Sequence, residues 1–423
     1  MNHFLIQRKS ALEANIKNEN QDFSMEQYKE IHIWDFPPTK TCLRIKEDFR
    51  RQLIRRAITC FGSWRRTIGY INTQSKIYGL ERKLSVGAIS HWARGIETTS
   101  RKTRNIPLWA VLEISKVLSE DQRNNNDLMK EIEENLEYFC AQGKGISVKT
   151  KFPMRLTPEV ISVIFHLCGD GHLANKDQMS HYRQVNKIGL ENFVTKLRNS
   201  FGDFYINEND LNNAKAGIPR IIAEFYRHYF KLNSCYWDVA RIPEEVKNMP
   251  KDFLVAGLTS FIIDEGHIGD QIEIYSGNKK LLSDIQEIAQ RLEYICNDPK
   301  EKIARGRING YRINISPKSA IKLYEDILVL KKKFPTCDLA HKMQKLENIV
   351  KIKTRIFRKH GLNETKKFIL ELLSRTPMTA TELSEKLTIN ASSLRDHLRQ
   401  LEEQGTIFKK EKLKHSILWG KIA

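Results

Sequence analysis

Two short apolar helices, each running into an acidic residue and a glycine, constrain this chain most. The segments Pro158–Leu173 and Asp252–Ile268 are apolar nearly all round, which predicts buried helices. They end at Asp170-Gly171 and Glu265-Gly266. A carboxylate at a helix C-terminus opposes the helix dipole at a cost of about 0.3–1 kcal/mol. The paired pattern favours a cation bound where the two helices end. The alternative is that both are core helices whose acidic residues merely begin a loop.

The two segments share more than their endings, because a histidine and an aliphatic residue follow both glycines. Leu258–Gly266 resembles the LAGLIDADG homing endonuclease motif at all nine positions, and Val163–Gly171 resembles it more loosely. The first motif departs from the family's preference for small residues where the helices cross. It carries Ile164 and Phe165, whereas the second carries Thr259 and Ser260.

The resemblance implies a duplicated core in which two motif helices pack side by side on a pseudo-twofold axis. Their terminal acids, Asp170 and Glu265, would hold Mg²⁺ or another divalent cation between two scissile phosphates, since oxygen ligands suit Mg²⁺. A chain with two motifs would act as a pseudo-dimeric monomer. Lys231 and Lys331 are candidate catalytic lysines near the two centres, with solvated helix-end lysines as the alternative.

Charge points to a polyanionic partner. The 423 residues include 70 Lys and Arg against 51 Asp and Glu, a net charge of +19, which together with helix-turn-helix patterns favours double-stranded DNA over a membrane. No apolar run reaches the length of a membrane span and the first residues do not resemble a signal peptide, so we expect a cytoplasmic or nucleoid-associated protein. Seven cysteines without a CxxC pair argue against zinc and against disulfides.

Alternating helical and strand patterns predict an α+β fold with antiparallel sheets, flanked by a small helical domain and a winged helix. The expected order is a loosely ordered tail (1–40), a helix-turn-helix-like domain (41–122), a helical connector (123–150), the LAGLIDADG-like core (151–346, with halves of about 151–245 and 246–346), a basic linker (347–362) and the winged helix (363–423).

The helix predicted after Ser85 gives the first candidate DNA contacts. Ser85 suits the N-cap, and Val86, Ile89 and Trp92 share one face. This arrangement would leave on the outer face Ser90, His91 and Arg94. The pattern resembles a helix-turn-helix recognition helix, and an ordinary helical bundle is the alternative.

A predicted hairpin supplies the next set of contacts. Asn309-Gly310 is the favoured two-residue type I′ turn, so Arg307 would face Arg312 and Arg305 would face Asn314. Like charges placed opposite each other are destabilising unless phosphates lie across them, although long side chains can also splay into solvent. Further DNA-contact candidates in the first half of the core are Arg183 and Lys187.

The last sixty residues resemble a winged helix. Thr379 and Glu382 form a capping box, the segment 390–404 reads as a third helix, and two strands follow around a basic turn. The exposed recognition face would present Ser392, Ser393, Arg395 and Arg399. Winged helices bind DNA or, alternatively, other proteins.

The function implied by the resemblance is a site-specific double-strand DNA endonuclease that hydrolyses phosphodiester bonds with magnesium. The alternatives are a non-cleaving DNA-binding transcription regulator on a degenerate LAGLIDADG scaffold, and an RNA-splicing cofactor. Retention of an acid in both motifs favours the nuclease, whereas the flanking DNA-binding modules and the bulky first motif favour the regulator.

Overall fold

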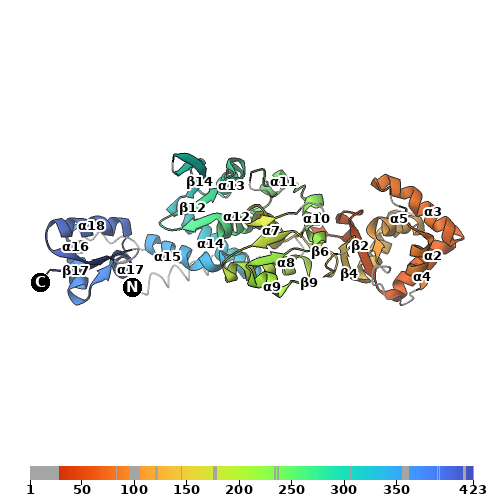
Figure 1. Cartoon of the computed structure of the whole chain (residues 1–423), viewed down its shortest axis with the longest axis horizontal. Helices are drawn as coiled ribbons and strands as arrows, with labels where there is room; N and C mark the ends of the chain where they lie inside the picture. Colours follow the sequence, from red (N-terminus) through yellow and green to blue (C-terminus); the bar gives the residue numbers. More distant parts are fainter. Residues whose placement is uncertain are drawn as a thin grey trace. The chain divides into compact units, whose positions relative to one another are not determined.

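A computed structural model describes residues 28–422 apart from 82, 95–104, 120–121, 144, 175–178, 233–234, 236–237, 305, 355–361, 388, 390 and 413–415. The chain is a mixed α+β protein with several antiparallel sheets. It divides into two compact units, residues 1–260 and residues 261–423. Figure 1 labels the helices and strands. No helix in the described part of the chain combines the length and apolar character needed to cross a bilayer.

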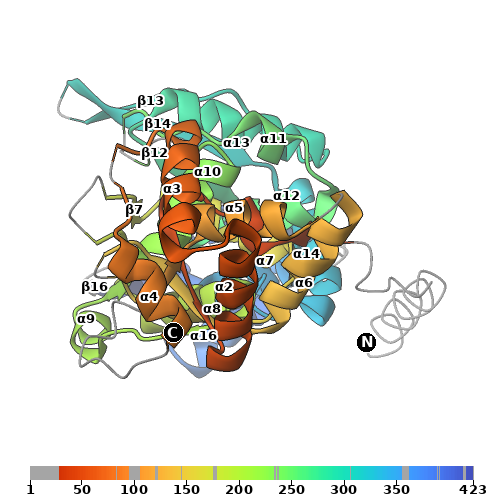
Figure 2. The ribbon, with the colours of Figure 1, turned by 90° about the vertical axis from the view of Figure 1, so that its right-hand side faces the viewer.

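The first unit opens with helices packed on a five-stranded sheet of order β3-β2-β4-β5-β9. Its helices are α2 (Glu47–Phe61), α3 (Trp64–Gln74), the 3-10 turn η3 (Ser75–Tyr78), α4 (Val86–Arg94), α5 (Leu108–Leu118) and α6 (Gln122–Glu134). Its strands are β2 (Thr41–Ile45), β3 (Ile106–Pro107), β4 (Leu136–Ala141), β5 (Val148–Lys149) and β9 (Asp203–Phe204). Figure 2 looks onto these helices.

Two expected boundaries in this region need correction. Residues 123–150, expected to be a helical connector, continue from α6 into β4 and β5, which are interior strands of the sheet. The expected tail, residues 1–40, is ordered from residue 28 onward: β1 (Glu30–Ile31) pairs with β6 (Met154–Arg155), and η2 (Ile33–Asp35) follows β1. Both segments carry buried apolar residues that the charged residues around them conceal in the sequence.

The rest of the first unit is built around α7 (Pro158–Cys168), in which every residue is buried. After α7, a three-stranded sheet of order β10-β8-β7 uses β7 (Gly171–His172), β8 (His181–Arg183) and β10 (Lys215–Gly217). The accompanying helices are α8 (Lys187–Phe201), α9 (Glu208–Asn212), α10 (Arg220–Tyr229), α11 (Glu244–Lys247) and α12 (Lys251–Glu265). Strand-like residues expected at 175–177 lie outside the described residues.

Close packing joins α7 to the first part of α12. A Cβ built on Gly257 would lie 2.2 Å from Cε2 of Phe165, so the Phe165 ring occupies the space that only a glycine leaves open. The bulky Phe165 of the first motif is therefore matched by a small residue of α12 that directly precedes the second motif. Sequence comparison of equivalent motif positions could not reveal this match, because Gly257 lies outside the nine-residue motif.

The second unit begins with a four-stranded sheet of order β11-β12-β14-β13. It contains β11 (Gly266–Ile268), β12 (Ile272–Ser276), α13 (Lys279–Arg291), β13 (Lys300–Ala304), β14 (Arg307–Ile315), α14 (Pro317–Lys333), η5 (Ala340–Lys342) and α15 (Met343–Thr354). The expected basic linker at 347–362 is helical as far as Thr354. The two sheets that follow the motif helices differ in their described strands, and an internal duplication stays a prediction.

The predicted hairpin turn is wrong. Ala304 pairs with Arg307 and Ile303 with Ile308, so the chain reverses direction before Arg307, and Gly306 there has φ +73°. Asn309-Gly310 instead lies inside β14. Arg312 consequently pairs with Lys300 and Tyr275, and Asn314 with Glu273, rather than with other arginines across a two-strand ladder.

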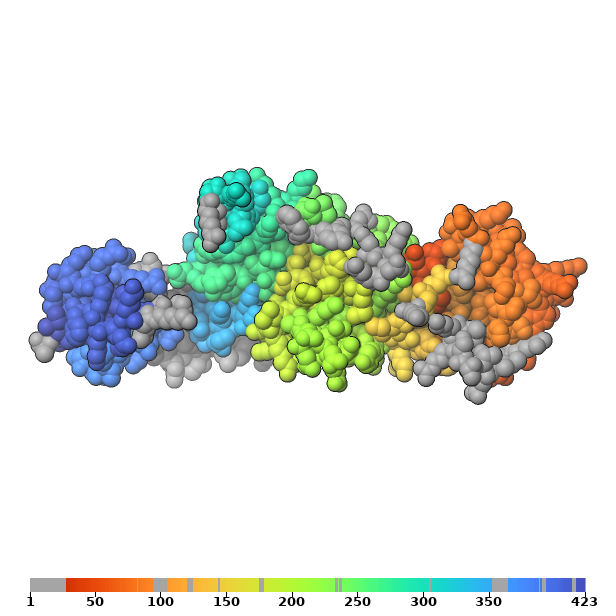
Figure 3. All heavy atoms as spheres, viewed as in Figure 1, coloured from red at the N-terminus to blue at the C-terminus, as the bar shows by residue number. Residues whose placement is uncertain are grey.

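The C-terminal domain has the order expected of a winged helix. It comprises α16 (Leu362–Arg375), β15 (Met378–Thr379), α17 (Ala380–Leu387), α18 (Ala391–Glu403), β16 (Ile407–Lys412) and β17 (Ile417–Lys421), with the sheet order β15-β17-β16. A separate apolar core includes Ile369, Leu383, Leu394, Leu398 and Trp419. The domain forms the blue group of atoms in Figure 3.

Candidate nucleic-acid interface

The acid-glycine endings of α7 and α12 have a structural reason. A Cβ on Gly171 would lie 2.4 Å from the Cα of Leu167, and a Cβ on Gly266 would lie 2.6 Å from the carbonyl oxygen of Ile262. Each glycine lets the chain turn from the last helical residues directly into a strand that passes close to the preceding turn. The glycine in each motif is thus required by backbone packing, whatever the chemistry of the neighbouring acid.

A lysine of the protein itself binds at the end of α12. The Lys342 ammonium group donates hydrogen bonds to the carbonyl oxygens of Ile262, at 2.9 Å, and Gly266, at 2.6 Å. Its charge offsets the negative end of the helix dipole, which the sequence suggested a bound metal would do. Lys342 was missed in the sequence because it lies about eighty positions after the motif, and no local pattern marks it.

Asp170 and Glu265 belong to different compact units. Asp170 is exposed, and one of its carboxylate oxygens accepts a hydrogen bond from Nε2 of Gln184 at 3.3 Å. Among the described residues, no three His, Cys, Asp or Glu side chains gather closely enough to hold a metal ion. The expected Mg²⁺ site stays a prediction.

The two candidate catalytic lysines have other partners. Lys231 has φ +53° and donates from Nζ to the carbonyl oxygen of His228 at 2.6 Å, which closes the end of α10. Lys331 forms an ion pair with Asp338. Both arrangements match the helix-end alternative that the sequence left open.

A buried polar cluster was also missed in the sequence. Nζ of Lys196 donates to Oγ of Ser260 at 2.8 Å and lies 3.1 Å from Nε2 of His166, and all three side chains are inaccessible to solvent. Burial, and secondarily the Lys196 charge, lowers the pKa of His166 well below its usual value. A neutral imidazole therefore accepts a hydrogen bond from Lys196, and the cluster ties α7, α8 and α12 together.

The four-stranded sheet carries a polar network around Glu273. Glu273 accepts hydrogen bonds from Tyr275 and from Gln271. These hydrogen bonds, together with the charge of the nearby Arg312, lower the pKa of Glu273. The Arg312 charge is thus partly balanced within the sheet. Arg307 is exposed at the start of β14, Asn314 is half-buried, and Arg305 lies outside the described residues. The predicted row of facing arginines is not present among the residues that the structure describes.

Helix α4 buries Ile89 and Trp92 as expected, but Val86 does not share their buried face. Ser85 caps it by accepting a hydrogen bond from the amide of Ala88 at 3.3 Å, but Val86 is exposed and not in the core. Ser90 and His91 are only partly exposed, and the Arg94 side chain lies outside the described residues. The contact of Ser90, His91 and Arg94 with DNA stays a prediction.

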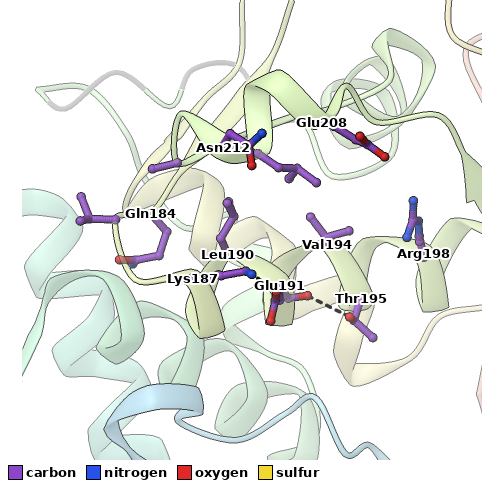
Figure 4. A pocket seen from close by; sticks show the side chains of 12 residues that line it. Gln184, Lys187, Leu190, Glu191, Val194, Thr195, Arg198, Glu208 and Asn212 are labelled. Atoms are coloured by element: carbon purple, nitrogen blue, oxygen red, sulfur yellow. Dashed lines mark hydrogen bonds and ion pairs between the residues drawn. The ribbon is translucent and has the colours of Figure 1, made fainter.

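A pocket of about 600 Å³ lies between α8, α9 and the chain entering β10 (Figure 4). It is lined by two cations, Lys187 and Arg198, and two carboxylates, Glu191 and Glu208. Lys187 lies 3.7 Å from Glu191 and is largely exposed. Arg183 is exposed in β8. The balanced charge gives this pocket no preference for an anion such as phosphate.

Three of the four side chains predicted for the recognition face of the winged helix lie within the described residues, and these three are exposed. Leu394, Leu398 and Leu401 turn into the core of the domain. On the other side of α18 the side chains of Ser393, Arg395 and Arg399 are exposed, while that of Ser392 lies outside the described residues. The capping box before α17 is present, since Thr379 N donates to Glu382 at 2.7 Å and Glu382 N donates to Thr379 Oγ1 at 3.3 Å.

Residues 363–408 match the family described as bacterial regulatory protein, arsR family. A relative of wider extent is the glutamine–fructose-6-phosphate aminotransferase (isomerizing) of Methanocaldococcus jannaschii. It is 25% identical over 291 residues, which cover 64% of this chain and 25% of that enzyme. The chain thus spans about a quarter of the length of this relative.

These comparisons contradict the homing endonuclease function predicted from the two motifs. One match is to a family of regulatory proteins and the other is to a protein named as an aminotransferase, and neither name describes a nuclease. The physical reason for the error lies in the motif glycines and Lys342, which explain the helix endings without catalysis. What is shown is an ArsR-type helix-turn-helix domain at the C-terminal end of an α+β chain.

Proposed function

We propose that this protein is a non-cleaving DNA-binding regulator that reads duplex DNA with α18 of its winged helix. The observation that carries the proposal is the match of residues 363–408 to bacterial regulatory proteins of the arsR family, on a domain with winged-helix order. In helix-turn-helix domains the second helix of the motif enters the major groove. Helix α18 occupies that position here.

The exposed side of α18 suits DNA. Arg395 and Arg399 lie one helical turn apart, and such a like-charged pair costs about 0.2–0.5 kcal/mol in an isolated helix. Neither arginine forms an ion pair among the described residues. Arginine can bind guanine or phosphate in bidentate fashion, which offsets this repulsion on a duplex. Ser393 adds a short hydroxyl near the start of the same helix.

The wing adds cations beside the helix. Lys409, Lys410 and Lys412 are exposed on β16. Lys409 is held 2.8 Å from Glu402 of α18, which fixes the wing to the recognition helix. Lys410 and Lys412 form no ion pair among the described residues, so they are the wing residues expected to contact phosphate.

The test is duplex binding by the full chain, measured by fluorescence anisotropy on a labelled 30-base-pair duplex at several salt concentrations. Replacing Arg395 and Arg399 with alanine removes two cationic groups that would bind phosphate or base edges. The slope of log K against log salt should become shallower by about 0.9 for each phosphate that is no longer neutralised. The matched control is Arg375→Ala, an exposed arginine on α16 that pairs with Glu371 at 2.7 Å.

Equal affinity and equal salt dependence for the double variant and the wild type would reject α18 as the reading element. Incubation of the protein with supercoiled plasmid and Mg²⁺ should leave the plasmid intact. A target sequence selected from a random duplex pool should lose its advantage over other sequences in the double variant, since base contacts carry specificity.

A second candidate function is an enzyme of sugar-phosphate metabolism, which the 25% identical aminotransferase favours. The match covers 25% of that enzyme. Two of the thiols that could attack an amide are unsuited to it: burial raises the pKa of Cys140 above its usual value, and burial raises the pKa of Cys42 to about 12. Glutamate release from glutamine with fructose 6-phosphate present would support this candidate, and its absence would reject it.

A further inference from the structure

We propose that the exposed faces of α2 and α3 form a second duplex-binding surface, which grips the phosphate backbone through Arg55, Arg56, Arg65 and Arg66. The inference rests on the proposed function in one respect, that the partner is duplex DNA. It is separate from the predicted contact of α4, whose outer residues are partly covered.

The four arginines are directed outward by the packing of their helices. Helix α2 turns Leu53, Ile54 and Ala57 into the core, and α3 does the same with Ile68 and Ile71. Arg55, Arg56, Arg65 and Arg66 are all exposed on the remaining faces. Figure 2 shows α2 and α3 toward the viewer.

A two-residue turn makes the two exposed faces neighbours. Gly62, with φ +75°, ends α2, and Ser63 caps α3 by accepting a hydrogen bond from the amide of Arg66 at 3.2 Å. Nη1 of Arg66 lies 3.8 Å from the position of a Cβ on Gly62, so this guanidinium group folds back over the turn toward α2. The positive charge thus continues around the corner between the helices.

Several other helical arginines in this chain have acidic neighbours, and these four do not. Ion pairs at a spacing of four residues join Arg51 to Glu47, Arg220 to Glu224, Arg291 to Glu287 and Arg375 to Glu371. No Asp or Glu stands three or four residues from Arg55, Arg56, Arg65 or Arg66. None of the four forms an ion pair among the described residues.

Gly69 gives an independent indication of close approach. It lies in the middle of α3 on the exposed side, with ordinary helical φ, and a Cβ there would meet nothing within 4 Å. Glycine in a helix interior costs about 0.5–1 kcal/mol relative to alanine, and internal packing does not require it here. A flat helix surface one turn after Arg65 and Arg66 allows a sugar-phosphate backbone to approach the helix axis closely.

The proposed surface is held rigidly from beneath. Asn72 donates from Nδ2 to the carbonyl oxygen of Leu84 at 2.9 Å and accepts from the Leu84 amide at 2.7 Å. Tyr78 donates from its hydroxyl to Glu113 at 2.7 Å. The buried Arg50 of α2 donates from Nε to the carbonyl oxygen of Trp92 at 3.0 Å, which docks α4 against α2. A preformed cationic surface avoids an ordering cost on binding.

The test compares two quadruple alanine variants of the full chain that lose the same charge. One replaces Arg55, Arg56, Arg65 and Arg66. The control replaces the acid-paired arginines Arg51, Arg220, Arg291 and Arg375. Anisotropy on a labelled 30-base-pair duplex should show that the first variant lowers the salt slope by about 2 to 4, and the control by less than about 1.

Equal reductions of the salt slope in the two variants would overturn the proposal, because net charge alone would then explain binding. Full binding by the α2–α3 variant, together with weak binding by the Arg395 and Arg399 variant, would also overturn it and leave the proposed function standing. Failure of the wild type to bind any duplex would reject the proposed function itself.

A single substitution separates shape from charge. Gly69→Gln adds an uncharged side chain to the exposed face and favours the helix, so folding should persist while duplex affinity falls. Unchanged affinity and salt slope for this variant would reject the close approach at Gly69. Circular dichroism of each variant checks that the helices remain formed.

Discussion

The substitution Gly257→Ala tests whether α7 and α12 are packed as tightly as the structure indicates. The new methyl group would lie 2.2 Å from Cε2 and 2.5 Å from Cζ of Phe165, where ordinary contacts are 3.4 Å or longer. Phe165 cannot simply swing away, because every residue of α7 is buried. Either the ring leaves its preferred rotamer or the helices separate.

The expected magnitude follows from two opposing effects. Overpacking of this kind costs about 1–3 kcal/mol. Alanine gains about 1 kcal/mol over glycine in a helix interior. We therefore expect a net destabilisation of about 0–2 kcal/mol, and replacing Phe165 with leucine in the same chain should recover most of it. The matched control is Gly69→Ala in α3, where a Cβ would meet nothing within 4 Å. This variant should show only the stabilisation that alanine gives over glycine in a helix.

Native-state hydrogen exchange measured by mass spectrometry suits this comparison, since a chain of several domains need not unfold in one step. Gly257→Ala should lower the opening free energy of peptides from α7 and α12, whereas Gly69→Ala should raise that of α3 by about 0.5–1 kcal/mol. Protection of α7 and α12 above the wild-type level in Gly257→Ala would refute the close packing.

Two further predictions concern buried polar groups. Because burial lowers the pKa of His166, the unfolded chain, with a histidine pKa near 6.5, takes up a proton that the folded chain does not. His166 should therefore make the free energy of unfolding fall by about 1.4 kcal/mol per pH unit below about pH 6.5. The variant His166→Gln should remove this one-proton contribution to the pH dependence of stability, measured by urea titrations at several pH values. An unchanged pH dependence would show that the imidazole is protonated in the folded chain. The variant Lys342→Met leaves the carbonyl oxygens of Ile262 and Gly266 without their charged donor. Hydrogen exchange should show that the opening free energy of the α12 C-terminus falls by about 1–3 kcal/mol. Lys342→Arg should lose less of this opening free energy than Lys342→Met. Equal protection in the Met variant and the wild type would show that the dipole end needs no cation.

The winged helix was predictable because its signals are local. The capping box at Thr379 and Glu382 and the glycine after α18 all act within a few residues. The spacing of Leu394, Leu398 and Leu401 sets which side of α18 faces inward, and with it the exposure of Arg395 and Arg399. Nothing outside this segment is needed to specify these features.

The hairpin was not predictable, because two turn signals compete within a few residues. Asn309-Gly310 has the stronger local preference, yet β14 forms a ladder with β12 from Ile315 to Tyr311 and with β13 from Arg312 to Arg307. The turn at Gly306 allows both ladders to form along one continuous strand. Pairing across three strands decided the register, and with it which arginines stand near Glu273.

The amino-acid sequence by itself determined the class of fold, the two buried motif helices and the basic C-terminal domain, since each depends on periodicity, capping and composition within short segments. Only the tertiary structure decided that Lys342 occupies the end of α12 and that the Phe165 ring packs against Gly257. It also decided that the arginines of α2 and α3 stand exposed on neighbouring helix faces. These outcomes depend on groups distant in sequence that folding brings together, and no local pattern encodes such distances.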